Sequence, residues 1–156
     1  MDYAFRYAES HPMDLEEDYD YTARKGSCRS SEYKGVFSPT GYHDVMRDSP
    51  SQLMAALDKH VVSVAIEADR RIFQSYRSGV ISSNQCGTHL DHGVTAVGYG
   101  DDYFIVKNSW GEEWGENGYV RISNSSKNIC GILSQPSYPS AWWNFYGDLL
   151  YVFIQK

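Results

Sequence analysis

In the central part of the chain, apolar residues recur first with the period of a helix and then with the period of strands. Ser49 and Pro50 suit the cap and the first position of a helix, on which Leu53, Met54 and Leu57 share one face. That apolar face needs a sheet to cover. Four β-branched or alternating runs predict the strands of this sheet, over residues 61–68, 93–99, 103–107 and 119–123.

The flanking regions are patterned differently. Residues 2–10 predict a short helix, and residues 14–41 predict a loop region rich in tyrosine and charge. An aromatic run over residues 142–154 closes the chain, and it is too short and too polar to predict a membrane span. We weigh two interpretations of this run, a partner-binding strand or an unrelated stretch. We favour the second, because a tail of this kind would expose apolar surface and promote aggregation.

Length and charge narrow the class of protein. A chain of 156 residues can bury one core, and its apolar content is that of an ordinary globular domain. A net charge of −6 disfavours a phosphate backbone as partner, so we expect no nucleic-acid binding. Thirteen tyrosines and four tryptophans favour β-rich packing with polar ring tips that reach solvent.

The most informative motif is the dodecapeptide at residues 107–118, Lys-Asn-Ser-Trp-Gly-Glu-Glu-Trp-Gly-Glu-Asn-Gly, preceded by Asp91-His92-Gly93. A histidine at the start of an apolar strand and an asparagine on a later turn suit a general base and its orienting group. Such a pair needs a nucleophile that faces it. No cysteine or serine of this chain is well placed to be that nucleophile.

On these residues, the chain from Met1 to about Pro139 resembles the C-terminal part of a papain-type cysteine protease of the cathepsin L branch. The resemblance implies an α+β papain-like fold, mainly its antiparallel β-barrel-like domain, with most of the helical domain missing. It also implies two segments, residues 1–139 as the family portion and residues 140–156 as a tail outside it. The family's cysteine precedes its histidine and asparagine by roughly 130–150 residues, so the nucleophile is expected before Met1.

The resemblance assigns roles to four residues of the motif. His92 is expected to take the thiol proton, and Asn108 to fix the orientation of the imidazole. Trp110 and Trp114 are expected to shield this pair from water. His89 and Asp91 beside His92 lack a suitable third ligand, so we expect neither a metal nor a cofactor.

The resemblance also implies a substrate pocket. Ala65, Leu90, Gly93 and Gln135 match the main specificity pocket, and Asp91 matches the leaving-group side. Three of the four pocket residues are small or apolar, which favours a bulky apolar substrate side chain. At Gln135 two interpretations stay open, a pocket that admits longer or polar side chains, or a glutamine that faces solvent.

Three cysteines leave one thiol over. The resemblance implies a disulfide between Cys86 and Cys130, and an unpaired Cys28 whose partner lies upstream. Three reduced thiols are the alternative, and for Cys28 alone that alternative is nearly as good. Cys86 is close to His92 in sequence, but its implied disulfide argues against a role as substitute nucleophile.

The class of protein and its compartment follow from the resemblance. We expect part of an endopeptidase of the lysosome or extracellular space, acting on peptides or proteins and joined to the missing N-terminal half. Met1 lacks a following signal segment, and we interpret it as an internal methionine taken as a start. Asn124 begins an Asn-Ser-Ser acceptor for glycosylation, although such tripeptides also arise by chance. The alternatives are a catalytically inactive peptide-binding relative and a product that does not fold.

Overall fold

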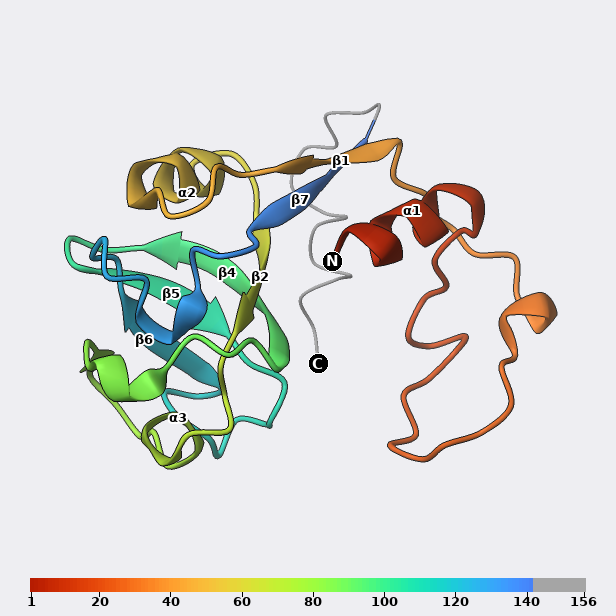
Figure 1. Cartoon of the computed structure of the whole chain (residues 1–156). Helices are drawn as coiled ribbons and strands as arrows, with labels where there is room; N and C mark the ends of the chain where they lie inside the picture. The colour runs from red at the N-terminus through yellow and green to blue at the C-terminus, as the bar shows by residue number, and fades with distance from the viewer. Residues whose placement is uncertain (142–156) are drawn as a thin grey trace. The chain divides into compact units, whose positions relative to one another are not determined.

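The computed structural model describes residues 1–141. They divide into two compact units, one made of Met1 with residues 43–138 and the other made of residues 2–42 and 139–141. The helices and strands of both units, in chain order, are α1 (Asp2–Ser10), η1 (Ser30–Glu32), β1 (Gly41–Asp44), α2 (Pro50–Leu57), β2 (Val62–Ile66), α3 (Arg71–Gln74), β3 (Val80–Ile81), η2 (Asn84–Cys86), β4 (His92–Tyr99), β5 (Tyr103–Lys107), β6 (Tyr119–Ser123), η3 (Ile129–Gly131) and β7 (Ser137–Ser140) (Figure 1).

The larger unit is built on a mixed sheet of seven strands in the order β1-β7-β2-β4-β5-β6-β3, of which β1 and β7 continue into the other unit. Strands β4, β5 and β6 form an antiparallel meander, and β2 pairs antiparallel with both β4 and β7. The two-residue strand β3 pairs parallel with β6. The sheet therefore departs from the purely antiparallel domain that the sequence predicts, at this one edge.

One apolar core lies beneath helix α2, which packs against β2 and β4. Leu53 of α2 is fully buried, and Met54 and Leu57 of the same face pack against the core. The helix begins as predicted, because the Ser49 hydroxyl accepts a 3.4 Å hydrogen bond from the Gln52 N–H and Pro50 stands at the first position.

The predicted strands are confirmed with small shifts of their ends. The run over residues 61–68 shortens to β2 because Glu67 turns out of the strand, and β4 begins one residue earlier than predicted, at His92. Strands β5 and β6 have the predicted bounds. Every second residue of β5 and β6 is buried, which explains why the alternation of apolar and polar residues in the sequence predicted these two strands.

The smaller unit holds α1 and a long loop. The helix has the predicted bounds, and the loop closes on itself through an isolated bridge between Met13 and Phe37. Beside that bridge, the Gly35 N–H donates to Asp14 Oδ1 at 2.9 Å. The predicted tail from Trp142 onward lies outside the described residues. No helix within residues 1–141 is long and apolar enough to cross a bilayer.

Candidate active site

Strands β4 and β5 bring the motif histidine and asparagine to the same end of the sheet. His92 opens β4 and Asn108 directly follows β5, and Thr95 of β4 lies opposite Lys107 of β5 in the antiparallel register. Two residues 16 positions apart therefore become neighbours across one hairpin. The Asn108 N–H donates to the Gly118 carbonyl at 2.9 Å, which fixes the backbone at this end.

The contact between the two side chains is a hydrogen bond between His92 Nε2 and Asn108 Oδ1, 2.8 Å long. The same amide oxygen accepts a hydrogen bond from the Ser109 N–H at 2.9 Å. A backbone N–H can act only as a donor, so the amide must present its oxygen, and His92 must then carry a proton on Nε2. In the neutral ring the lone pair consequently lies on Nδ1, where the ring can accept a proton.

Burial gives this hydrogen bond a low-dielectric surrounding. Asn108 is 7% exposed, and its Nδ2 has no hydrogen-bond partner within residues 1–141. Turning the amide over would set Nδ2 against the Ser109 N–H and leave the oxygen without a donor, so the observed orientation is the better one. The amide oxygen of Asn108 is thus oriented toward His92, and the amide nitrogen is left without a hydrogen bond within residues 1–141.

Trp110 covers the pair from the side of the histidine. Its ring stacks on His92 with centroids 5.3 Å apart and an interplanar angle of 29°, while 42% of the residue remains exposed. Trp110 in turn meets Trp114 and Phe73 edge to face. The indole is therefore held against the imidazole by aromatic packing from behind.

Trp114 does not contact His92 directly. It is buried, its ring packs against Phe73 and Tyr76, and its Nε1–H donates to the Gln74 carbonyl at 3.2 Å. The two tryptophans that the sequence singled out therefore differ in position. Trp110 touches the imidazole, and Trp114 supports Trp110.

The structure brings together part of the predicted substrate pocket. Ala65 of β2 lies opposite Gly93 of β4 in the register, next to the pair Ile66 and His92. Leu90 is half-buried and lies so close to Gly131 that a Cβ there would approach Leu90 Cδ2 to 2.6 Å. Gln135 is exposed in the segment before β7, and no hydrogen bond within residues 1–141 ties its side chain to the other positions.

Asp91 has a partner that the sequence did not indicate. Its carboxylate accepts a hydrogen bond from the Ala68 N–H at 2.7 Å, and its own N–H donates to the Ile66 carbonyl at 3.0 Å. These two bonds fasten the residue before His92 to the end of β2.

The cysteines divide as the sequence implied. Cys86 and Cys130 form a disulfide, which removes Cys86 as a nucleophile beside His92. Cys28 is a free, exposed thiol of the smaller unit, and a hydrogen bond with the Ser30 hydroxyl lowers its pKa. Asn124, the predicted glycan acceptor, points its Nδ2 at the Gly100 and Asp101 carbonyls, 3.4 and 3.3 Å away.

Three residues near the site escaped the sequence analysis. Ser109 acts through its backbone, which leaves no trace in the identity of its side chain. Phe73 lies outside the motif and outside the predicted strands, so no pattern indicated its ring contacts with Trp110 and Trp114. Glu67 did carry a signal, because it is a charge within a β-branched run, and it proves to be almost fully buried.

Comparisons with known proteins show what the chain is similar to. A family model described as "Papain family cysteine protease" matches residues 1–140. Germination-specific cysteine protease 1 of Arabidopsis thaliana is 45% identical over 149 residues, which cover 89% of this chain and 39% of that protein. Oryzain beta chain of Oryza sativa subsp. japonica is 47% identical over 149 residues, which cover 90% of this chain and 32% of that protein. The chain thus spans about a third of the length of these relatives.

Solved structures give the same result for the fold. A cysteine protease of Carica candamarcensis in complex with E-64 superposes with a TM-score of 0.82 at 39% identity, covering 89% of this chain and 67% of that one. The bromelain protease from Ananas comosus superposes with a TM-score of 0.78 at 40% identity, covering 88% of this chain and 67% of that one. Both likenesses extend over nearly the whole described structure.

Proposed function

Because this chain belongs to the papain family of cysteine proteases, we propose that it is the histidine- and asparagine-bearing C-terminal part of a cysteine endopeptidase of the cathepsin L branch. The observation that carries the proposal is the hydrogen bond from His92 Nε2 to Asn108 Oδ1, stacked upon by Trp110. Its substrates are peptides or proteins, and its compartment is the lysosome or the extracellular space.

The chemistry follows from the proton positions. His92 Nδ1 takes the proton of a cysteine thiol, and the thiolate sulfur attacks the carbonyl carbon of the scissile peptide bond. The imidazolium then returns its proton to the departing amine nitrogen, while the hydrogen bond to Asn108 keeps the orientation of the His92 ring fixed. Trp110 excludes water from the Nε2–H bond and strengthens it.

The attacking sulfur comes from outside this chain. Within the larger unit the two cysteines, Cys86 and Cys130, are joined in a disulfide, so no free thiol of that unit lies beside His92. Ala65 and Gly93 are cross-strand neighbours, and we propose that they line, together with Leu90, a pocket for a bulky apolar side chain. A peptide-binding relative without turnover is the second candidate, favoured by that same absence of a thiol beside His92.

The first test is the proton position on His92. In long-range ¹H–¹⁵N spectra of the labelled 156-residue chain at neutral pH, we expect the Nε2–H tautomer of His92. Asn108→Ala removes the acceptor and should lower the ratio of Nε2–H to Nδ1–H by about tenfold, the effect of losing one buried hydrogen bond. The ring of His43, which packs on Tyr138, serves as the internal control and should not change. A dominant Nδ1–H tautomer in the unaltered chain would contradict the proposal.

The second test concerns the source of the nucleophile. The purified chain should not hydrolyse fluorogenic peptides. Hydrolysis that thiol reagents inhibit and that Cys86→Ala abolishes would show that the sulfur lies within this chain. The intact mass of the native protein, reduced and non-reduced, separates the two candidates, since a protease needs additional sequence or a partner chain.

A further inference from the structure

Glu67 carries a charge into the core of the larger unit. It follows the last residue of β2 and is 1% exposed, which makes it the most deeply buried ionisable side chain of the described residues outside the disulfide. Burying a carboxylate is costly unless its oxygens receive hydrogen bonds or a counter-charge. The contacts around Glu67 therefore have to be strong ones.

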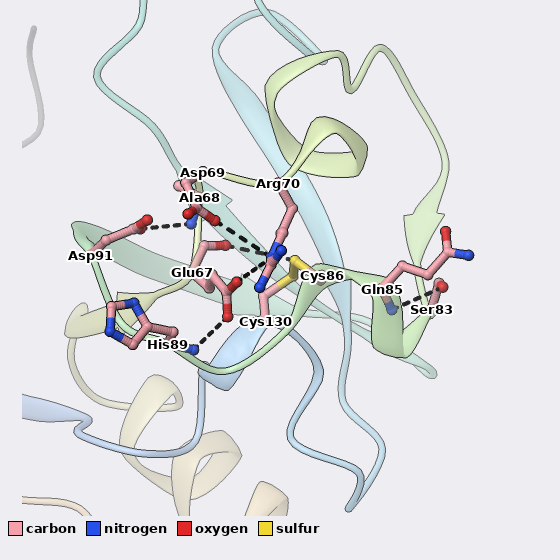
Figure 2. Close-up of a disulfide and its surroundings, with 10 residues drawn as sticks. All are labelled: Glu67, Ala68, Asp69, Arg70, Ser83, Gln85, Cys86, His89, Asp91 and Cys130. Carbon is pink, nitrogen blue, oxygen red and sulfur yellow. Dashed lines mark hydrogen bonds and ion pairs between the residues drawn. A yellow bond between two sulfur atoms is a disulfide. The ribbon is translucent and has the colours of Figure 1, made fainter.

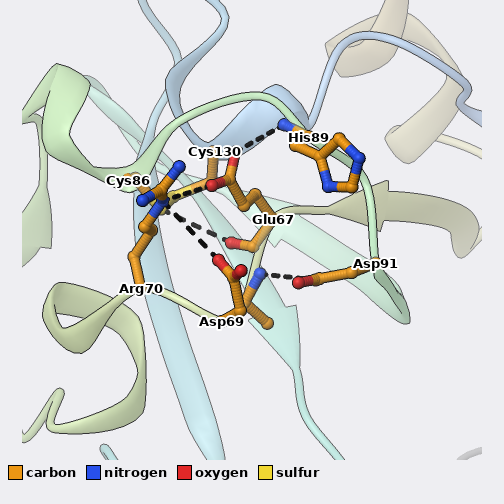
Figure 3. A network of polar contacts seen from close by, with 8 residues as sticks. Glu67, Asp69, Arg70, Cys86, His89, Asp91 and Cys130 are labelled. Atoms are coloured by element: carbon orange, nitrogen blue, oxygen red, sulfur yellow. Dashed lines mark hydrogen bonds and ion pairs between the residues drawn. A yellow bond between two sulfur atoms is a disulfide. The ribbon is translucent and has the colours of Figure 1, made fainter.

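Both carboxylate oxygens have a donor. Oε2 accepts a hydrogen bond from the backbone N–H of His89, and Oε1 accepts one from Arg70 Nε (Figures 2 and 3). The His89 N–H, and then Arg70, lower the pKa of Glu67 against the opposing effect of burial. These contacts favour the charged form of the carboxylate, and each of its oxygens accepts a hydrogen bond.

The segment around His89 is shaped to receive this carboxylate. Gly87 has a φ of +75°, and a Cβ at that position would stand 2.2 Å from Glu67 Oε2. A residue with a side chain therefore cannot replace Gly87 without moving the acid. Figure 2 shows the same segment joined to Cys130 by the disulfide at Cys86.

Three attachments hold this segment to the end of β2. The first is the disulfide at Cys86, whose partner Cys130 also accepts the Glu67 N–H at 2.8 Å. The last is Asp91, bonded to Ile66 and Ala68. Glu67 supplies the middle attachment, at His89, and the chain then runs directly into His92. Without that middle bond, residues 86–91 would keep the attachments at Cys86 and Asp91 and the packing of Thr88 and Leu90 beside Gly131.

We propose that Glu67 is a positioning residue, whose buried carboxylate sets the backbone of residues 87–91 and thereby holds the His92 ring on Asn108. The inference rests on the proposed function of His92. It concerns how closely the orientation of the His92 ring toward Asn108 is maintained. Glu67 itself touches neither His92 nor Asn108. Leu90, on the same segment, is placed by the same contact, so the apolar pocket wall and the base share one anchor.

Glu67→Gln tests the proposal with the smallest change of shape. A glutamine presents one acceptor and one NH₂ group to two donors, so either His89 or Arg70 faces a donor. The chain also offers a matched control in Glu116, which likewise pairs with an arginine, Arg121, and accepts a backbone N–H, from Gly79. Glu116→Gln removes the same chemistry from the loop between β5 and β6.

In ¹⁵N-labelled 156-residue chains, Glu67→Gln should shift the His89 amide proton upfield and lower the Nε2–H to Nδ1–H ratio of His92 by about threefold to tenfold, as for one weakened hydrogen bond. Glu116→Gln should leave both signals unchanged. An equal loss in both variants, or an unchanged His92 ratio in a Glu67→Gln chain whose His89 amide has moved, overturns the proposal. Absence of the Nε2–H tautomer in the unaltered chain would instead refute the proposed function.

Should Glu67→Gln fail to fold, Arg70→Gln decides the matter. The Arg70 side chain is 57% exposed, so its replacement spares the core, and it releases Oε1 so that the carboxylate can turn away from His89. We expect the same two changes at smaller amplitude. A moved His89 amide with an unchanged His92 ratio would again overturn the proposal.

Discussion

At the scale of the residue, Gly87 makes the buried acid possible. Among the glycines with positive φ in residues 1–141, Gly79 and Gly111 have open space where a Cβ would stand, and Gly35 and Gly115 have backbone atoms there. At Gly87 the neighbour is the carboxylate of Glu67. Conformation and space therefore forbid a side chain at the same position, and the two effects can be separated by experiment.

Gly87→Ala should destabilise the chain more than Gly79→Ala. Both positions have positive φ, of +75° and +92°, and a residue other than glycine in such a backbone conformation costs about 1–3 kcal/mol. Gly79 has nothing within 4 Å of the added Cβ, so a loss at Gly87 beyond this backbone range reports the displacement of Glu67. Urea denaturation at neutral pH gives both free energies of unfolding. Equal losses would show that Glu67 moves aside freely.

The sequence could identify the two residues of the candidate site but not the contact that orients them. His92 and Asn108 were recognisable from their motif, and the hairpin of β4 and β5 was recognisable from its alternation. The choice of Nε2 over Nδ1 depends on the Ser109 N–H, whose direction is set by the backbone of the turn after β5. No pattern of side chains reports that direction.

At the scale of the element, local patterns were sufficient where an element is long or capped. Helix α2 carries its start signal in Ser49 and Pro50, and the meander carries its period. Strand β3 has two residues and pairs parallel with β6 across some forty positions, so no local period could reveal it. The αL conformation of Cys130 in η3 is likewise imposed by its surroundings, since cysteine has no preference for it.

Ser49→Ala tests the cap of α2. The substitution removes the acceptor of the Gln52 N–H and should lower the free energy of unfolding by about 1 kcal/mol. Ser51→Ala, two residues later, keeps the Ser49 acceptor and removes the 3.3 Å hydrogen bond between the two hydroxyls, and it should change stability by less than about 0.5 kcal/mol. Thermal unfolding followed by circular dichroism compares the two. Similar losses would mean that the long 3.4 Å contact contributes little.

The disulfide between η2 and η3 should contribute more than any cap. It links positions 44 residues apart, for which loop-closure entropy gives about 4 kcal/mol. Replacing Cys86 and Cys130 together by alanine should lower the denaturation midpoint accordingly. Cys28→Ala, at a free and exposed thiol, is the control and should have little effect. A loss below about 1 kcal/mol would indicate that the denatured chain keeps this loop closed.

At the scale of the whole molecule, the carboxylates of Glu67 and Glu116 make the free energy of unfolding depend on pH. The pKa of Glu67 is lowered by the His89 N–H and Arg70, and the pKa of Glu116 by Arg121 and the Gly79 N–H. A depressed carboxylate pKa stabilises the fold above the ordinary glutamate value of about 4.3, and this contribution is lost as the pH falls through the lowered value. The fold should therefore weaken at strongly acid pH.

The melting temperature should fall as the pH is taken from neutral to well below the ordinary glutamate pKa. A chain carrying both Glu67→Gln and Glu116→Gln should melt lower at neutral pH and should lose less on acidification, because two of the titrating groups are gone. Single variants should lie between. A double variant with the slope of the unaltered chain would assign the acid response to other carboxylates.

The hairpin that joins His92 to Asn108 also sets an order of events in time. These residues are 16 positions apart, whereas the disulfide spans 44 and the pairing of Ser63 with Ser137 is longer still. Hairpins close in about 1–10 μs, and long-range pairing is slower because more chain must be gathered first. We therefore expect the hydrogen bond between His92 and Asn108 to form early in folding. The contact of Glu67 with His89 and the pairing of β7 with β2 should form later.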